Sequence, residues 1–300
     1  MLRWRLLSSA ILIPALLLII WLDLFCGREQ TVDITGLIVA PIIVVFAVLA
    51  VGELLGLFSA QKLNPLRWTV YLGTALVVLA ACVPLLWKGY PANCPLGILG
   101  WPLSAMALCV GLAFLGEMRR YKEPGGVIVN VALSVFAIAY VGLLLSFLCL
   151  LRGLESNEWG MIALLAPIII VKVSDSGAYT VGRLFGKHKL APRLSPGKTI
   201  EGVVGAIVTG CLASWLVFQY LAPALSDVST PWWASLLFGL IVTIAGILGD
   251  LAESLIKRDM DRKDSSTWIP GLGGVLDILD SILFAAPAAY ACFAVGLVGS

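Results

Sequence analysis

The sequence predicts an all-α integral membrane protein that crosses the bilayer about nine times. Hydrophobic residues make up 60% of the 300 residues and charged residues only 13%, whereas a soluble domain is nearer half apolar and a quarter charged. The mean hydropathy is +1.00. We treat residues 1–300 as a single polytopic membrane domain, with the polar motifs concentrated in 172–281.

The expected spans follow from the lengths of the apolar runs. A transmembrane helix needs roughly 20 apolar residues. Arg3 and Arg5 precede a first run that is too long for a typical signal peptide and lacks a small-residue cleavage pattern, so we expect it to be retained. The nine segments that qualify are bounded by charge, proline or glycine and cover about 6–25, 36–60, 68–87, 97–118, 127–151, 159–182, 200–225, 232–257 and 279–298.

Basic residues test this count, because cytoplasmic loops carry an excess of Lys and Arg. With the N-terminus in the cytoplasm, the outside segments contain Arg28, Lys88 and Arg152, and Lys172 lies within a span. The other sixteen of the 20 basic residues fall inside: Arg3, Arg5, Lys62, Arg67, Arg119, Arg120, Lys122, Arg183, Lys187, Lys189, Arg193, Lys198, Lys257, Arg258, Arg262 and Lys263. We therefore expect a multi-pass protein of a bacterial inner membrane, with a cytoplasmic N-terminus and the C-terminus outside.

Two further features of the composition narrow the expectations. The net charge of +2 is too near neutral to indicate a nucleic-acid partner, and the chain has no Cys/His cluster that would indicate zinc. Tryptophans at the expected span ends are typical of membrane anchoring. They are Trp68, Trp87, Trp159, Trp232 and Trp233.

The segment from Gly249 to Ser281 joins two apolar runs and is rich in charge. Asp250, Glu253 and Lys257 are spaced to share one helical face. Asp277 and Asp280 have i, i+3 spacing at the start of the next helix, after the glycines 271, 273 and 274. Paired carboxylates beside lysines and a glycine-rich bend indicate a metal and phosphate site. The alternative is a solvated loop, which we favour for the charges of 258–262.

A second polar segment runs from Lys172 to Gly202. Lys172 and Asp175 lie at i, i+3 within a span, where an ion pair lowers the cost of burying both. For Lys172 this structural pairing and a functional role stay equally open. For Asp175 we favour function, because Ser174, Ser176 and Gly177 allow close helix packing or close approach of a ligand.

The loop that follows contains Ser195-Pro196-Gly197-Lys198-Thr199. Its end is similar to a Walker A loop, but the required earlier glycine is Pro192 and no preceding strand is expected. Thr199 or a neighbour is expected to cap the next helix, whose free N–H groups and dipole favour an anion. Lys198 adds a positive charge there, so we predict a triphosphate contact. Lys187 and Lys189 are better explained by anionic lipid head groups.

These two stretches resemble the phosphatidate cytidylyltransferases, also called CDP-diacylglycerol synthases. The matching pieces are 174–202 and 249–281, and the second resembles the signature S-x-x-K-R…K-D-x…P-G-x-G-G-x-x-D-x-x-D. Two positions depart from the family pattern. The family usually has His where this chain has Leu272, and Arg where this chain has Ile278. The resemblance implies transfer of CMP from CTP to phosphatidic acid, giving CDP-diacylglycerol and pyrophosphate.

The resemblance and the residues together give the expected site. The attacking phosphate is already anionic, so the main demands are alignment and neutralisation of charge by a divalent metal and lysines. We expect Mg²⁺, and leave open a second monovalent or divalent cation. Asp277 and Asp280 are the predicted metal ligands, with Asp250 and Asp175 as further ligands or support. The predicted catalytic residues are Asp277, Asp280, Lys257 and Lys263, and the two lysines are expected to contact phosphate together with Lys198. The predicted nucleotide-binding residues are Ser195, Gly197, Lys198, Thr199, Gly273 and Gly274.

Two other functions stay open at this point. A CTP-dependent kinase of a polyprenol or phytol would release CDP in place of pyrophosphate. A secondary transporter also carries acids in broken membrane helices, but most acids here lie at one face. The expected partners are CTP, phosphatidic acid and membrane lipids, with a homodimer left open and no nucleic acid.

Overall fold

The computed structural model describes residues 18–24, 36, 38–87, 89–91, 93–266 and 273–299. Helices dominate, as predicted. The chain divides into two compact units, the first formed by residues 1–153 with 260–279 and the second by residues 154–259 with 280–300. Each unit therefore combines segments that are far apart in the sequence. The expectation of a single membrane domain stays a prediction.

Seven helices of the described residues are long and apolar enough to cross a membrane. Each falls on one of the predicted spans. The predicted span at 68–87 is instead a shorter apolar helix, α3 (Arg67–Ala81), followed by α4 (Val83–Leu86). Pro84 lies at this junction. Proline has no backbone N–H, so it cannot donate the hydrogen bond that would continue α3 into α4. The first predicted span is helical at 18–24, and the rest of it lies outside the described residues, so the count of nine is not confirmed.

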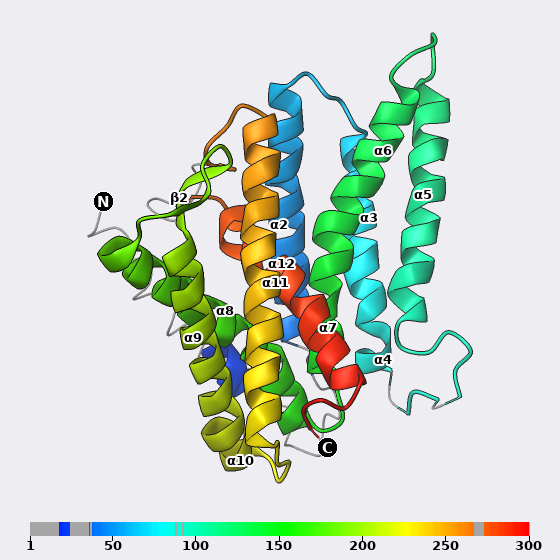
Figure 1. Ribbon diagram of the computed structural model, residues 1–300. Helices are drawn as coiled ribbons and strands as arrows, with labels where there is room; N and C mark the ends of the chain where they lie inside the picture. Colours follow the sequence, from blue (N-terminus) through cyan, green and yellow to red (C-terminus); the bar gives the residue numbers. More distant parts are fainter. Residues whose placement is uncertain are drawn as a thin grey trace. The chain divides into compact units, whose positions relative to one another are not determined.

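The first unit is built from helices that pack side by side around α3 (Figure 1). One span contains a π-helical turn, η1, where Gly142 lets α3 approach: a Cβ there would lie 3.2 Å from the Cα of Thr74. The remaining elements are α2 (Val39–Ala60), α5 (Gly100–Arg120), α6 (Val127–Ala137), η1 (Ile138–Leu143) and α7 (Leu144–Arg152).

Arg152 is the last residue of α7 and is fully buried, so it belongs to the end of the helix and not to the loop that follows it. Its guanidinium lies 2.8 Å from Oδ2 of Asp23, and the side chain of Asp23 is only 1% exposed. Oδ1 of Asp23 accepts a hydrogen bond from the backbone N–H of Ile38, just before α2. A buried ion pair needs such additional hydrogen bonds to offset its desolvation. The pair therefore ties residues 18–24 to α2 and α7.

The second unit has an aromatic core. The rings of Trp159, Phe218, Phe238 and Phe293 form a chain of contacts with centroid distances of 5.1 to 6.3 Å. Trp159 is 1% exposed and is therefore a core residue, where we expected a membrane anchor. The helices of this unit are α8 (Asn157–Phe185), α9 (Ile200–Leu216), η2 (Val217–Leu221), α10 (Ala222–Leu225), α11 (Trp232–Asp259) and the later part of α12 (Val275–Ala294).

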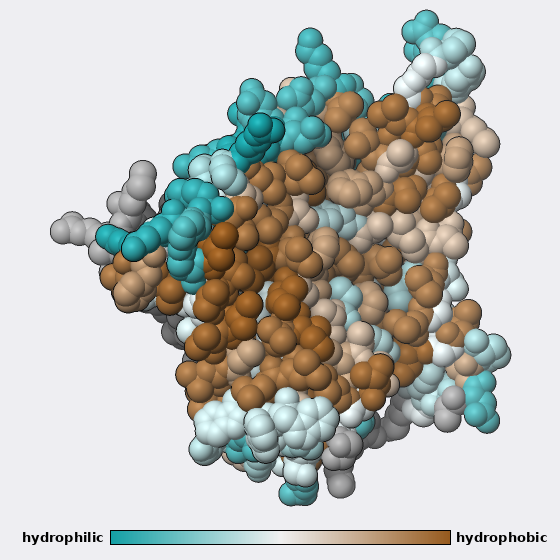
Figure 2. Space-filling model, viewed as in Figure 1, coloured by the Kyte–Doolittle hydropathy of each residue, from teal (hydrophilic) through white to brown (hydrophobic). Residues whose placement is uncertain are grey.

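A hairpin connects α8 to α9, and it corrects the expectation that no strand precedes the Gly-Lys-Thr sequence. Strand β1 (Lys189–Ala191) pairs antiparallel with β2 (Ser195–Thr199), which leads directly into α9. On α9, the exposed side chains of Ile200, Val204 and Val208 recur every fourth residue and form an apolar stripe. Figure 2 shows hydrophobic side chains over α9 and α11, and hydrophilic ones over the hairpin. The hairpin therefore lies where the apolar surface of these helices ends.

Candidate active site

The β1–β2 hairpin is fixed to the helices on either side of it. The carboxylate of Glu201, in the first turn of α9, accepts hydrogen bonds from the backbone N–H groups of Lys187 (3.1 Å) and His188 (3.2 Å). At the opposite end of the hairpin, Nε of Arg258 donates to the carbonyl of Leu194 at 3.2 Å. Arg258, at the end of α11, therefore binds the hairpin, whereas the sequence analysis favoured a solvated charge for it. The two contacts therefore hold the hairpin at its base and at its turn.

A cavity of about 450 Å³ opens beside this hairpin in the second unit. Its walls come from α8, β2, α9 and α11, so elements from four places in the sequence meet there. The structure brings together six of the predicted site residues around this cavity: Asp175, Ser195, Gly197, Lys198, Thr199 and Asp250. Its other walls are mostly small or apolar, as expected for a ligand pocket.

Two lysine–aspartate pairs mark this region. Nζ of Lys198 lies 2.6 Å from Oδ2 of Asp250, with both side chains about two-thirds to four-fifths buried. Nζ of Lys172 lies 3.8 Å from Oδ2 of Asp175, and both of these side chains are nearly half exposed. The Lys172 pairing predicted from the i, i+3 spacing is confirmed. The Lys198–Asp250 pair joins β2 to α11, and the spacing in the sequence gave no sign of it.

Asp280 belongs to the same electrostatic cluster. Its carboxylate interacts with those of Asp250 and Asp175 and with the Lys172 ammonium. Close packing of α11 on α12 creates this proximity, because a Cβ on Gly249 would overlap the carbonyl oxygen of Asp280. Only glycine allows that approach, so Gly249 sets the neighbouring Asp250 beside Asp280. Three carboxylates from α8, α11 and α12 thus gather with two ammonium groups.

The donor chemistry of this cluster fits a hard divalent cation. Carboxylate oxygens are the ligands that Mg²⁺ prefers, and the Lys198 ammonium already occupies a cation position against Asp250. Within the part of the chain that the structure describes, no three acidic, His or Cys side chains converge closely enough to form a ready-made metal site.

The start of α9 is less open to an anion than its sequence predicts. Thr199 is the N-cap, as expected, and its Oγ1 accepts a hydrogen bond from the N–H of Gly202 at 3.1 Å. The N–H of Ile200 donates to the carbonyl of His188 at 2.9 Å. Two of the first helical N–H groups are thus already satisfied. Side chains around the cavity must supply most donors for a phosphate.

Arg183 and Tyr179 are cavity residues that the sequence analysis did not single out as site residues. Nη1 of Arg183 donates to the Tyr179 hydroxyl at 3.0 Å, and the guanidinium lies 6.0 Å from the ring centroid. An aromatic contact of this kind orients a guanidinium. The signal available in the sequence was the i, i+4 spacing of the two residues on α8, next to Asp175.

Comparison with known proteins decides the family. The family model described as "Cytidylyltransferase family" matches residues 3–295. The chain belongs to this family. A phosphatidate cytidylyltransferase of Mycobacterium leprae is 32% identical over 271 residues, covering 86% of this chain and 83% of that protein. The enzyme of the same name from Bacillus subtilis is 37% identical over 161 residues, covering 54% of this chain and 57% of that protein, so the match spans little more than half of its length.

The signature of this cytidylyltransferase continues in the first unit, around the start of α12. Asp277 lies in the first turn, and its Oδ2 accepts hydrogen bonds from the N–H of Gly274 (2.7 Å) and from the N–H (3.2 Å) and Oγ (2.8 Å) of Ser265. This is the reach-back contact of a capping box. Gly273 adopts a φ of 86°. The structure thus gives Asp277 a capping role, and its predicted metal binding stays a prediction.

The two lysines predicted as phosphate contacts differ in their surroundings. Nζ of Lys257 lies 2.8 Å from Oε2 of Glu253, whose side chain is fully buried, so the predicted shared helical face is confirmed as an ion pair. Lys257 is not among the residues that line the cavity of the second unit. Lys263 is exposed in the bend that follows α11. The predicted bend at 270–272, which includes the departure Leu272, lies outside the described residues, and Ile278 lies within α12.

Proposed function

We propose that this cytidylyltransferase transfers CMP from CTP to phosphatidic acid, giving CDP-diacylglycerol and pyrophosphate. The observation that carries the proposal is the cavity of the second unit. It combines the Lys198–Asp250 pair with Arg183, and it lies where the apolar stripe of α9 ends. Relatives named phosphatidate cytidylyltransferase support the choice of substrates.

The side chains suit the two substrates in different ways. Lys198 supplies a point charge and Arg183 a planar fork for phosphate oxygens. The apolar stripe of α9 lets a lipid reach the cavity while its acyl chains stay in the bilayer. The attacking oxygen belongs to a phosphate that is already anionic, so no His–acid pair is required. Orientation by these side chains is therefore the main contribution of the protein.

Mg²⁺, when bound, would neutralise charge on the reacting and leaving phosphates. We propose Asp175, Asp250 and Asp280 as the residues that would hold it, and the electrostatic interactions among these three carboxylates support the proposal. Lys198, released from Asp250, would then face the nucleotide. A second cation and a homodimer stay predictions.

The reaction has a direct test. With Mg²⁺, CTP and phosphatidic acid, the protein purified in detergent should release pyrophosphate in step with formation of a CDP-lipid, and EDTA should abolish both. Labelled CTP with separation of the products by charge measures the outcome. A parallel incubation with phytol is the control. Release of CDP and a phosphorylated alcohol there would replace the proposal with a lipid kinase, and no consumption of CTP in either mixture would favour a transporter.

We also propose a cytoplasmic N-terminus in a bacterial inner membrane, which puts the β1–β2 hairpin on the side where CTP is found. The excess of basic residues in the inside segments supports this orientation. Reporter fusions within 183–198 and 121–126 should report the cytoplasm, and fusions within 153–156 and after Ser300 the opposite side. The same side for the 183–198 and 153–156 fusions would show that α8 does not cross the membrane, because α8 alone separates them. A report of the outside for the 183–198 fusion would contradict the proposed orientation.

A further inference from the structure

In the first unit, both carboxylate oxygens of Glu53 accept hydrogen bonds from residues just before and at the start of α12. We call this set of contacts, made by Ser265, Ser266, Val275 and Leu276, the Glu53 clamp. Glu53 is the one charged residue of α2, and it points at the start of α12. Its Oε1 accepts hydrogen bonds from the N–H of Val275 (2.9 Å) and Oγ of Ser266 (2.7 Å). Its Oε2 accepts from the N–H of Leu276 (2.8 Å) and Oγ of Ser265 (3.0 Å). Both oxygens are thus bound by the same segment of chain.

The geometry of this contact is specific for a carboxylate. Val275 and Leu276 are the first two residues of α12, so their N–H groups have no partner within the helix. A negative charge at a helix N-terminus also gains from the helix dipole. Gly274 is packed so closely that a Cβ there would overlap Oε2 of Glu53. The glycine of the signature is therefore required by the approach of Glu53.

Asp277 completes the clamp from within α12. Oγ of Ser265 lies within 3.0 Å of Oε2 of Glu53 and 2.8 Å of Oδ2 of Asp277. A serine hydroxyl has one hydrogen to donate, so it serves one carboxylate at a time while the backbone N–H groups hold the other. The two acids thus fix the chain on both sides of residues 267–272. The contacts lie two and three residues after Lys263 and in the first turn of the helix that carries Asp280.

We propose that Glu53 is a positioning residue for the reaction, because it holds the first turn of α12 and the two serines that precede the glycine-rich bend. The inference rests on the proposed function. Glu53 fixes where α12 begins and how it is rotated about its axis, and Asp280 lies further along the same helix. A helix that starts in a different rotation would carry the Asp280 carboxylate away from its productive orientation. Misplacement of a reacting group by about 1 Å can cost on the order of a hundredfold in rate.

The test compares Glu53→Gln with Glu117→Gln. Gln has the size of Glu but replaces one acceptor oxygen with an NH₂ group, so the backbone N–H of either Val275 or Leu276 loses its acceptor. We expect kcat to fall about tenfold while the KM for CTP stays within about twofold, because the clamp does not bind the nucleotide. Hydrogen exchange of substrate-free protein should quicken at Val275 and Leu276 and stay unchanged elsewhere in the first unit.

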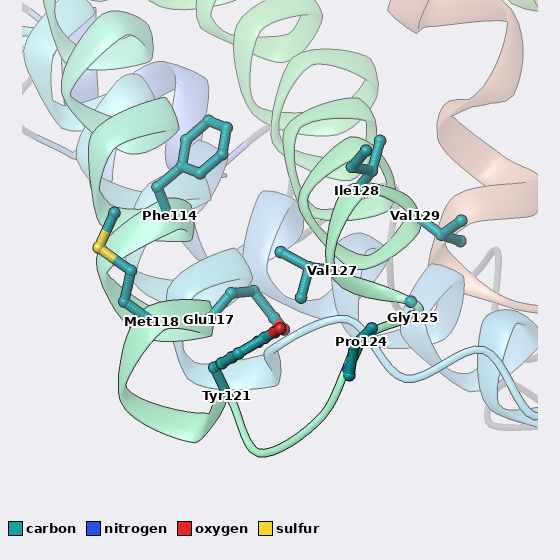
Figure 3. A pocket seen from close by; sticks show the side chains of 10 residues that line it. Phe114, Glu117, Met118, Tyr121, Pro124, Gly125, Val127, Ile128 and Val129 are labelled. Carbon is teal, nitrogen blue, oxygen red and sulfur yellow. The ribbon is translucent and has the colours of Figure 1, made fainter.

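Glu117 on α5 is the matched control. Its side chain is 4% exposed, pairs with Arg120 at 3.3 Å and accepts from Asn130 at 3.3 Å. Figure 3 shows it among apolar side chains at the ends of α5 and α6, which line a cavity of about 540 Å³. Glu117→Gln therefore removes a buried charge of the same unit without touching α12. We expect kcat within about twofold of the unchanged protein and no change in exchange at 275–276.

Several outcomes would overturn the inference. They are an unchanged kcat in Glu53→Gln, an equal loss in Glu117→Gln, or a loss accompanied by faster exchange throughout the unit. If Glu53→Gln does not accumulate, Ser266→Ala removes one donor and should lower kcat about threefold with faster exchange at 275–276; no change in either would also overturn it. The exchange measurement needs no substrate, so a failure of the proposed reaction, seen as no pyrophosphate from the unchanged protein, is distinguishable from a failure of the clamp.

Discussion

Changing Asp280 to Asn should lower kcat about a hundredfold at saturating substrates. The carboxylate lies in one electrostatic cluster with Asp175 and Asp250, and these three are the proposed ligands of the divalent cation. Asn keeps the volume of the side chain and removes the charge. Loss of one anionic ligand should cost the transition state roughly 3 kcal/mol, which corresponds to about a hundredfold in rate. The measurement is turnover across a Mg²⁺ titration at equal membrane abundance.

Asp259 and Asp261 are the matched controls for this change. Both are exposed at or just after the end of α11. Asn at either position should lower turnover by less than about fivefold, as expected for solvated charges. Near-normal turnover of the Asp280 variant at every Mg²⁺ concentration would exclude Asp280 from the metal site, which would then have to be rebuilt around Asp175 and Asp250.

Changing Asp277 to Asn should show whether this residue caps α12 or binds a metal ion. An Asn there keeps an oxygen that can accept from the N–H of Gly274 and the hydroxyl of Ser265, so a capping role is partly preserved. As a cap, Asp277→Asn should show a smaller loss than Asp280→Asn and no change in the Mg²⁺ requirement. A loss equal to that of Asp280→Asn, with a raised Mg²⁺ requirement, would instead support the metal ligation predicted from the sequence.

Changing Lys198 to Ala should lower kcat/KM for CTP about thirtyfold. The ammonium lines the cavity and pairs with Asp250 at 2.6 Å. Its removal takes away a cationic phosphate contact and leaves Asp250 without this partner. Hydrogen bonds that involve charged groups are worth about 1.5–3 kcal/mol each, or roughly ten- to a hundredfold. Initial rates with CTP and phosphatidic acid varied separately measure the effect.

Lys187 is the control for this basic segment. It is exposed just before β1, and its backbone N–H, rather than its side chain, makes the contact to Glu201. Lys187→Ala should leave the KM for CTP within about twofold. Equal effects of the two changes would remove the distinction between them. A Lys198→Ala variant with an altered KM for phosphatidic acid alone would place Lys198 at the lipid.

The sequence by itself determined the class of the protein and the location of its polar motifs. Apolar runs of sufficient length can satisfy their backbone hydrogen bonds in a bilayer only as helices. Seven of the nine predicted spans accordingly coincide with helices of the described residues that are long and apolar enough to cross a membrane. Local spacing also sufficed for contacts within one helix. The pair Lys172–Asp175 and the cap Thr199 both depend on neighbours within four residues, and both are confirmed.

Only the tertiary structure decided which residues from different helices meet. Lys198 with Asp250 and Arg152 with Asp23 are ion pairs between segments far apart in the sequence, and nothing in the local spacing encodes them. Glu53 shows the reason most clearly. A lone acid in an apolar helix signals a functional or paired group, but its partners are backbone N–H groups and serines more than 200 residues away. Every residue except proline has a backbone N–H group, so the type of residue does not mark these donors in the sequence. The contact can be recognised only once the packing of the helices is known.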